Sequence, residues 1–168
     1  KLDALKKAGP GSVAEAYKSA TEALPHVADA DAIALWGFQD VEPLLQAAPH
    51  VRWVHSLSDG VEKLLTPSMM ERPIILTNSH GVHDRAVSAH TMALLLSWFR
   101  RIPDAVRSQS AHIWSRPHGE SLFGKTILIV GFGSIGRAIA QRAKVFETHI
   151  LAVKKHLSHE MFADHVYT

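Results

Sequence analysis

The sequence predicts an α/β protein in which parallel strands alternate with helices. Two observations carry this prediction. Short apolar runs alternate with helical patterns along the first hundred residues, and an apolar strand at residues 126–130 leads into a glycine-rich turn and then a helix. The composition agrees, because 46% hydrophobic and 20% charged residues are typical of a globular chain. The 168 residues allow one ordinary domain or two small ones.

Composition also excludes several classes of protein. The chain has no cysteine, which rules out disulfides, zinc–thiolate sites and cysteine nucleophiles. A net charge of +2 does not indicate a nucleic-acid partner. The apolar run at residues 92–96 is too short to cross a bilayer, and no segment has a signal-peptide layout, so we expect a cytoplasmic protein without a membrane partner.

The twelve histidines include two groups that suggest metal ligands, but neither has acids placed to complete a site, and we expect no metal. These groups are His80 and His83, and His156, His159 and His165.

The first hundred residues contain three apolar runs that predict strands, with helices between them. The strands are expected at residues 32–36, 51–55 and 73–78, and the helices at residues 1–8, 40–48 and, as a short helix, 61–65. Asp40 is a suitable N-cap, and Pro43 is tolerated in a first helical turn. A long, largely apolar helix should then begin near Asp84 and end before Pro103.

The remaining residues predict a second, shorter alternation. We expect a helix over residues 103–113, a loop at residues 115–119, a strand at 126–130, a helix at 137–144 and a strand at 148–153. Two strands of a second parallel sheet are therefore expected in this part of the chain.

The turn after residue 130 has the pattern Gly-x-Gly-x-x-Gly, written here as Gly131, Phe132, Gly133, Ser134, Ile135 and Gly136. In this context the first glycine allows a tight turn, the second lets phosphates approach the backbone, and the third lets the helix pack close to the strand. The helix N-terminus supplies N–H groups and a favourable dipole for the negative charge. The pattern predicts a dinucleotide site; a plain strand–turn–helix is the alternative.

The residue after the second strand should meet the adenosine ribose. An NAD site usually has an acid there, whereas this chain has Lys154, 18 residues after Gly136, followed by Lys155, and its next acid is Glu160. A lysine attracts a 2′-phosphate and a carboxylate repels it. The sequence therefore favours NADP over NAD; the alternative is that the two lysines are only a solvated loop.

Three separated blocks together resemble one enzyme family. They are residues 52–62, residues 76–82 with 86–96, and residues 122–137. In this order they resemble the NAD(P)-dependent D-isomer-specific 2-hydroxyacid dehydrogenases, which include glyoxylate and hydroxypyruvate reductases and phosphoglycerate dehydrogenase. The third block alone is shared with many dinucleotide-binding proteins, and the combination is specific.

The resemblance implies a flavodoxin-like substrate domain over residues 1–100, lacking its first strand, followed by the first part of a Rossmann NAD(P)-binding domain over residues 101–168. It implies hydride transfer between a nicotinamide and a 2-hydroxy or 2-oxo acid. Ser58, Asp59 and Gly60 would offer backbone N–H groups to the substrate carboxylate, which is physically sensible for a loop after a strand; an ordinary turn is the alternative. Thr91 would belong to the cofactor site together with the glycine loop and the two lysines.

The chain departs from the family in two respects. Ala89 stands where many relatives have a glutamate before His90 and Thr91. The catalytic arginine, glutamate and histidine of the family come from positions after Thr168, so no catalytic residue is assigned in this chain, and residues 1–168 alone are expected to be inactive. Pro117-His118-Gly119 superficially resembles the surroundings of the catalytic histidine, but it lies on the wrong side of the glycine loop.

The resemblance also implies a homodimer, formed through the helix before the glycine-loop strand. Two other functions stay open: a non-enzymatic, dinucleotide-sensing module such as a corepressor, because fold alone does not fix function, and another Rossmann oxidoreductase resembling alanine dehydrogenase. The particular 2-hydroxy acid cannot be derived from the sequence.

Overall fold

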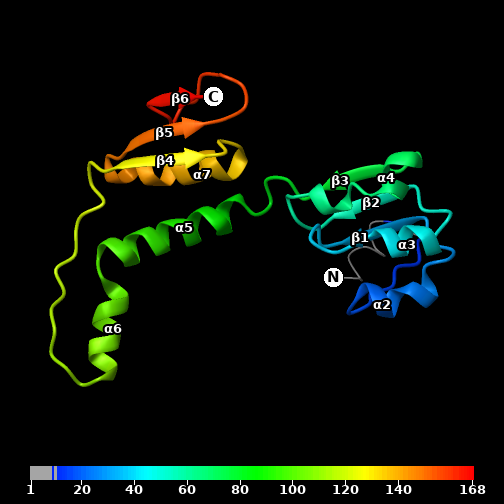
Figure 1. Ribbon diagram of the computed structural model, residues 1–168, viewed down its shortest axis with the longest axis horizontal. Helices are drawn as coiled ribbons and strands as arrows, with labels where there is room; N and C mark the ends of the chain where they lie inside the picture. Colours follow the sequence, from blue (N-terminus) through cyan, green and yellow to red (C-terminus); the bar gives the residue numbers. More distant parts are fainter. Residues whose placement is uncertain (1–8, 10) are drawn as a thin grey trace. The chain divides into compact units, whose positions relative to one another are not determined.

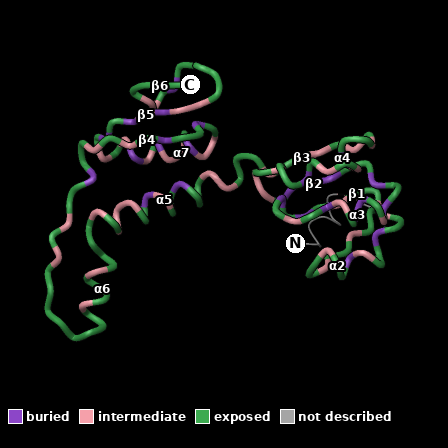
Figure 2. The backbone as a smooth tube through the Cα atoms, in the orientation of Figure 1, coloured by how far each residue is buried: buried purple, intermediate pink, exposed green. Residues whose placement is uncertain are grey.

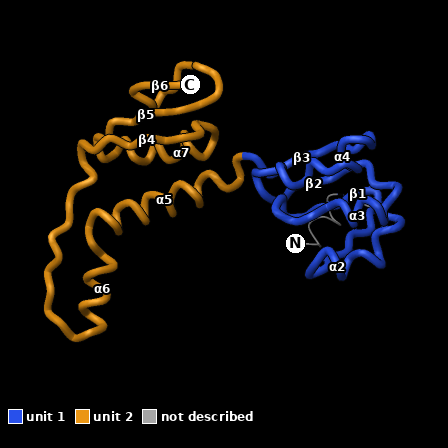
Figure 3. The backbone as a smooth tube through the Cα atoms, in the orientation of Figure 1, with its two compact units in different colours: residues 1–80 blue, residues 81–168 orange. Residues whose placement is uncertain are grey.

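A computed structural model describes residue 9 and residues 11–168. Contacts divide the chain into two compact units, residues 1–80 and 81–168 (Figure 3). The division falls twenty residues before the boundary expected at residue 100, because the long helix α5 (Asp84–Phe99) packs against α7 (Ser134–Ala143) of the second unit. The helix expected at residues 1–8 lies outside the described residues.

The first unit is built on a parallel sheet of three strands. These are β1 (Ala32–Leu35), β2 (Trp53–Ser56) and β3 (Ile75–Asn78), in the order β1-β2-β3. Ala32 lies opposite Trp53, which lies opposite Ile75. Helices α3 (Glu42–Ala47), η2 (Glu62–Leu64) and α4 (Pro67–Glu71) connect the strands (Figure 1). All three strands expected from the apolar runs are therefore present, with boundaries that differ by a few residues.

The core of this unit lies between the sheet and its helices. Val41, Leu45, Val54 and Leu64 have at most 1% of their surface exposed. Arg72 fastens the end of α3, because its guanidinium donates to the carbonyl oxygens of four residues. These are Leu45 at 2.7 Å, Ala48 at 3.0 Å, Pro49 at 2.9 Å and Val51 at 3.0 Å. The carbonyls that follow the last helical turn are thereby satisfied by one cation.

Three short helical segments of this unit were not predicted. Helix α2 (Ala20–Ala23) begins at Ser19, whose hydroxyl accepts the Glu22 N–H at 3.2 Å, and η1 (Leu24–His26) continues it. The third is α4, which has a proline in its first turn. Helices of three to five residues contain too few positions for a 3.6-residue period to be recognised.

The second unit has a parallel sheet in the order β4-β5-β6. Its strands are β4 (Thr126–Val130), β5 (His149–Val153) and β6 (His165–Tyr167), and η3 (Lys144–Phe146) follows α7. The sequence predicted two strands here, and this was wrong. The third strand, β6, was missed because only three of its residues pair with β5, too few to give a recognisable strand pattern. Phe132, Ala140, Ala143 and Ile150 form the centre of a core between the sheet and α7, against which Met92 of α5 also packs.

Helix α6 (Ile102–Ser110) follows α5 after Arg101, which adopts a left-handed conformation with φ 56°. Neither α6 nor most of the loop after it is buried by the described residues (Figure 2). Val106 is 52% exposed and Trp114 is 97% exposed.

Among the described helices, none has both the length and the apolar composition that a membrane crossing requires.

Candidate functional site

The glycine loop joins the end of β4 to the start of α7. Gly131 has φ +90°, a conformation that glycine adopts without strain, and this residue turns the chain out of the strand. The N–H groups of Gly131 and Phe132 donate to the carbonyl oxygen of Val153 at 2.9 and 3.2 Å. Phe132 is 2% exposed and anchors the loop in the core. The loop is thus tied to the neighbouring strand β5 by backbone hydrogen bonds and to the core by the Phe132 side chain.

The second and third glycines occupy different environments. A Cβ built on Gly133 meets no atom within 4 Å, so open space faces this residue. A Cβ on Gly136 would lie 2.6 Å from the Gly131 carbonyl oxygen and 3.3 Å from a methyl carbon of Ile129. Gly133 therefore leaves room beside the backbone, and Gly136 permits close contact between α7 and the strand. This is the arrangement that a pyrophosphate group needs, and the loop fits it.

The first turn of α7 adds hydrogen-bond donors beside that space. The first backbone bond at the start of α7 runs from the Arg137 N–H to the Gly133 carbonyl at 3.0 Å. The N–H groups of Ser134, Ile135 and Gly136 precede it and have no acceptor within the helix. Together with the helix dipole they favour a bound anion. Thr91, on α5, donates its hydroxyl to the Val87 carbonyl at 2.9 Å within its own helix.

Lys154 follows β5, as expected, but its ammonium group has protein partners. Its Nζ donates to the Ser158 hydroxyl at 2.8 Å and forms an ion pair with Glu160, and only 17% of its side chain is exposed. Lys155, in contrast, is exposed. The two lysines predicted to meet the adenosine ribose therefore differ, because one is held in place and the other extends into solvent.

Glu160 connects this strand end to α7. Its carboxylate accepts hydrogen bonds from Arg137 Nε at 2.7 Å and Arg137 Nη2 at 2.9 Å, besides those from Lys154 and Ser158. The Arg137 hydrogen bonds, followed by that of Lys154, hold the pKa of Glu160 far below its ordinary value. Sequence reasoning missed this role, because Arg137 and Glu160 lie 23 residues apart and no local pattern relates them.

The loop at residues 58–60 lies after β2 of the first unit. Ser56, fully buried, bonds through its hydroxyl to the Ser58 N–H at 3.2 Å and to the Gly60 carbonyl at 3.1 Å. The Ser58 hydroxyl accepts the Gly37 N–H at 3.0 Å. Of the three N–H groups expected to face a carboxylate, that of Ser58 is therefore already used inside the loop. The Asp59 and Gly60 N–H groups have no acceptor among the described residues.

Asp59 is held by Asn78, the last residue of β3, and by His80, which follows the strand. The Asn78 amide donates to the Asp59 carbonyl at 2.6 Å, and His80 Nδ1 lies 2.6 Å from the Asp59 carboxylate. His80 was considered as a metal ligand, and instead it pairs with this acid. No group of three or more histidine and acidic residues suitable for a metal occurs in the described part of the chain.

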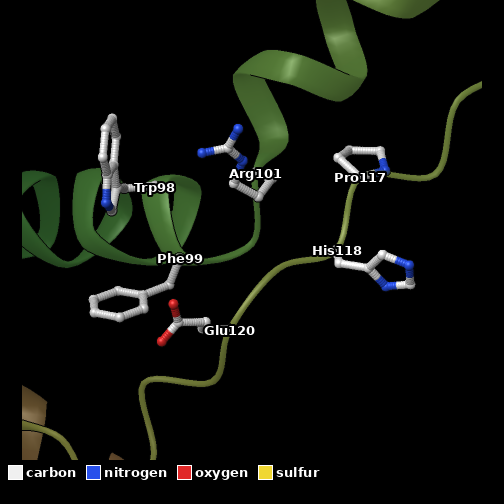
Figure 4. A pocket seen from close by; sticks show the side chains of 6 residues that line it. All are labelled: Trp98, Phe99, Arg101, Pro117, His118 and Glu120. Atoms are coloured by element: carbon white, nitrogen blue, oxygen red, sulfur yellow. The ribbon is translucent and has the colours of Figure 1, made fainter.

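A pocket of about 330 Å³ in the second unit contains His118 (Figure 4). It is lined by Trp98, Phe99, Arg101, Pro117, His118 and Glu120. Arg101 pairs with Asp104 at 2.6 Å and Glu120 pairs with Lys125 at 2.7 Å, so the charged groups have partners of their own. The His118 ring points away from Phe99 and Glu120 in Figure 4. We assign no catalytic role to His118.

The second unit thus has the architecture of a dinucleotide-binding α/β unit. Residues 92–168 match the family described as "D-isomer specific 2-hydroxyacid dehydrogenase, NAD binding domain". For these residues, the match confirms the resemblance carried by the three sequence blocks.

Similar proteins have related functions. The chain is 33% identical over 135 residues to the D-3-phosphoglycerate dehydrogenase of Mycobacterium leprae, covering 79% of this chain and 26% of that protein. It is 33% identical over 138 residues to the glyoxylate reductase of Pyrococcus furiosus, covering 76% and 41%. A solved structure of a D-isomer specific 2-hydroxyacid dehydrogenase family protein from Aeromonas salmonicida superposes with a TM-score of 0.86 at 29% identity, covering 99% of this chain and 53% of that chain. The chain therefore spans about a quarter to a half of these proteins.

Proposed function

We propose that this chain forms part of an NAD(P)-dependent oxidoreductase that transfers hydride between a nicotinamide and a 2-hydroxy or 2-oxo acid. The observation that carries the proposal is the glycine cradle: open space at Gly133, close packing at Gly136, and donors at the start of α7, within residues that match an NAD-binding domain family. The nicotinamide supplies the hydride, and the protein supplies binding and orientation.

In this proposal the two units have different tasks. Helix α5 and residues 101–168 together form the beginning of the nucleotide-binding domain. The residues before α5 form the substrate domain. The N–H groups of Asp59 and Gly60 bind the substrate carboxylate, with Ser56, Asn78 and His80 holding their loop in shape. His80 Nδ1 lies 2.6 Å from the Asp59 carboxylate and fixes the position of this side chain.

NADP is the preferred cofactor in this proposal. Support comes from the strand end, where Lys154 and Lys155 replace the acid that an NAD site uses. Arg137 adds a third cation, and both Arg137 and Lys154 contact Glu160.

A homodimer and a cytoplasmic location complete the proposal. Support for the dimer is the amphipathic helix α6, on which Ile102 and Val106 are about half exposed, together with the exposed Ile113 and Trp114 that follow it. Such a surface suits an isologous contact with a second copy.

The direct test uses the full-length protein that contains this chain. NADPH and NADH are titrated by fluorescence, and oxidation of the preferred cofactor is followed with glyoxylate, hydroxypyruvate and pyruvate. Micromolar binding together with turnover of at least one acid is expected. Absence of binding contradicts the proposal, and binding without turnover of any 2-oxo acid supports the dinucleotide-sensing module instead.

A further inference from the structure

We propose that Glu160 is the specificity-determining positioning residue of this dinucleotide site. It holds Arg137 and Lys154 as one fixed cationic pair at the ribose end of the glycine cradle, and thereby selects a dinucleotide that carries a 2′-phosphate. The inference rests on the dinucleotide binding proposed above.

The placement of the three side chains follows from the topology. Arg137 is in the first turn of α7, directly after Gly136, and Lys154 directly follows β5. Because β4 and β5 are parallel, their carboxyl ends and the start of α7 meet at the same edge of the sheet, where ligands of doubly wound sheets bind. Glu160, in the loop between β5 and β6, joins the two cations at that edge.

Glu160 does not itself replace the acid that an NAD site places after the strand. Its carboxylate already accepts two hydrogen bonds from Arg137 and one each from Lys154 and Ser158. Three of these bonds end on Oε1 and one on Oε2, so most of the roughly four acceptor positions of a carboxylate are occupied. Only 6% of its side chain is exposed. The group is therefore built to organise its neighbours and not to contact a ligand.

The cations that Glu160 organises retain capacity for a second anion. Two positive groups share one negative charge, which leaves the cluster with a net positive charge. Arg137 uses Nε and one Nη2 hydrogen for Glu160, and its side chain is 49% exposed, so its other N–H groups are available to a phosphate. A guanidinium fixed by a two-point contact loses less rotamer entropy when it binds a phosphate than a freely moving one.

If Glu160 positions the two cations, removing its charge should change the NADPH affinity in the direction opposite to that expected from charge repulsion alone. Glu160→Gln keeps the side-chain size and removes the negative charge. If Glu160 acted only as a nearby anion, the variant would bind NADPH more tightly. If Glu160 positions the cations, the variant binds NADPH more weakly although the cluster has become more positive.

The experiment measures dissociation constants in the full-length protein for NADPH and NADH, and for 2′,5′-ADP and 5′-AMP, which probe the ribose end alone. The wild type is expected to prefer NADPH and 2′,5′-ADP. Glu160→Gln should weaken both of these by about tenfold, a loss typical of one charged hydrogen-bonded contact, and NADH by less than about twofold. Glu160→Asp should restore part of the preference. Glu120→Gln, which removes the charge of another lysine-paired glutamate in the same unit, is the matched control and should change nothing.

The outcomes separate this inference from the function on which it rests. A wild-type protein that binds neither dinucleotide overturns both. A wild-type protein that binds NADH as tightly as NADPH, or more tightly, overturns only the role of Glu160. A Glu160→Gln variant that keeps or increases the NADPH preference overturns this role as well. Ser158→Ala removes one partner shared by Lys154 and Glu160, and it should lower the preference in the same direction by a smaller factor. An unchanged preference in a folded Ser158→Ala variant counts against the proposal if Glu160→Gln does not fold.

Discussion

Gly136 lies against the backbone of Gly131 so closely that a Cβ on Gly136 would stand 2.6 Å from the Gly131 carbonyl oxygen. The carbonyl belongs to the turn after β4, and Gly136 to the first turn of α7. The strand, the turn and the helix are thus locked together through backbone contact. The start of α7 is held in a defined position beside the open space at Gly133.

Gly136→Ala should therefore destabilise the second unit. The clash involves a backbone oxygen that cannot rotate away, and overpacking of this kind costs about 1–3 kcal/mol. Gly133→Ala, the same change three residues earlier, meets no atom within 4 Å and should cost less than about 1 kcal/mol. Thermal unfolding of the two variants in the full-length protein checks this order. Equal stabilities would contradict the packing described for Gly136.

The pH dependence of stability should reflect Asp164. Its carboxylate accepts the Ile150 N–H at 2.6 Å and pairs with Lys144 at 2.6 Å, and these contacts, in that order, lower its pKa from 3.8 to about 2. Because the pKa is lower in the folded protein, the stabilisation is fully present above pH 4 and is lost as the pH falls toward 2.

Asp164→Asn is the variant that isolates this effect. It should be less stable than the wild type at pH 7, and the difference should shrink as the pH falls from 4 to about 2. Urea denaturation between pH 2.5 and 7, followed by circular dichroism, gives the two curves. A difference that stays constant over this range would show that the charge of Asp164 does not contribute.

The proposed dimer can be tested on α6. Val106→Glu places a charge on its exposed apolar face, and charge at the centre of an apolar contact opposes association. The variant should be a monomer in light scattering at micromolar concentration, where we expect the wild type to be a dimer. Gln141→Glu adds the same charge at an exposed position on α7, away from the proposed contact, and should remain a dimer. A monomeric wild type refutes the dimer outright.

The elements that the sequence predicted well are those with local signals. The three strands of the first unit and the glycine loop depend on neighbouring residues, such as the turn at Gly131 and the apolar run before it. Contacts between distant residues were not predictable in this way. Glu160 and Arg137 meet across 23 residues, and Ser56 uses the Ser58 N–H that was expected to face a substrate. The boundary between the units lies earlier than predicted, because the apolar composition of α5 does not indicate which of the two cores this helix packs against.

We propose that the open space at Gly133 receives the phosphates of a dinucleotide, and Gly133→Val is the sharpest probe of this binding. The φ of Gly133 is −86°, which valine adopts, and no described atom lies within 4 Å of its Cβ position, so the fold should survive. The isopropyl group would occupy the place of the pyrophosphate. We expect a folded full-length variant whose affinity for NADPH, measured by fluorescence titration, falls by at least about a hundredfold, the effect of losing several phosphate contacts. A folded variant that binds NADPH as tightly as the wild type would contradict it.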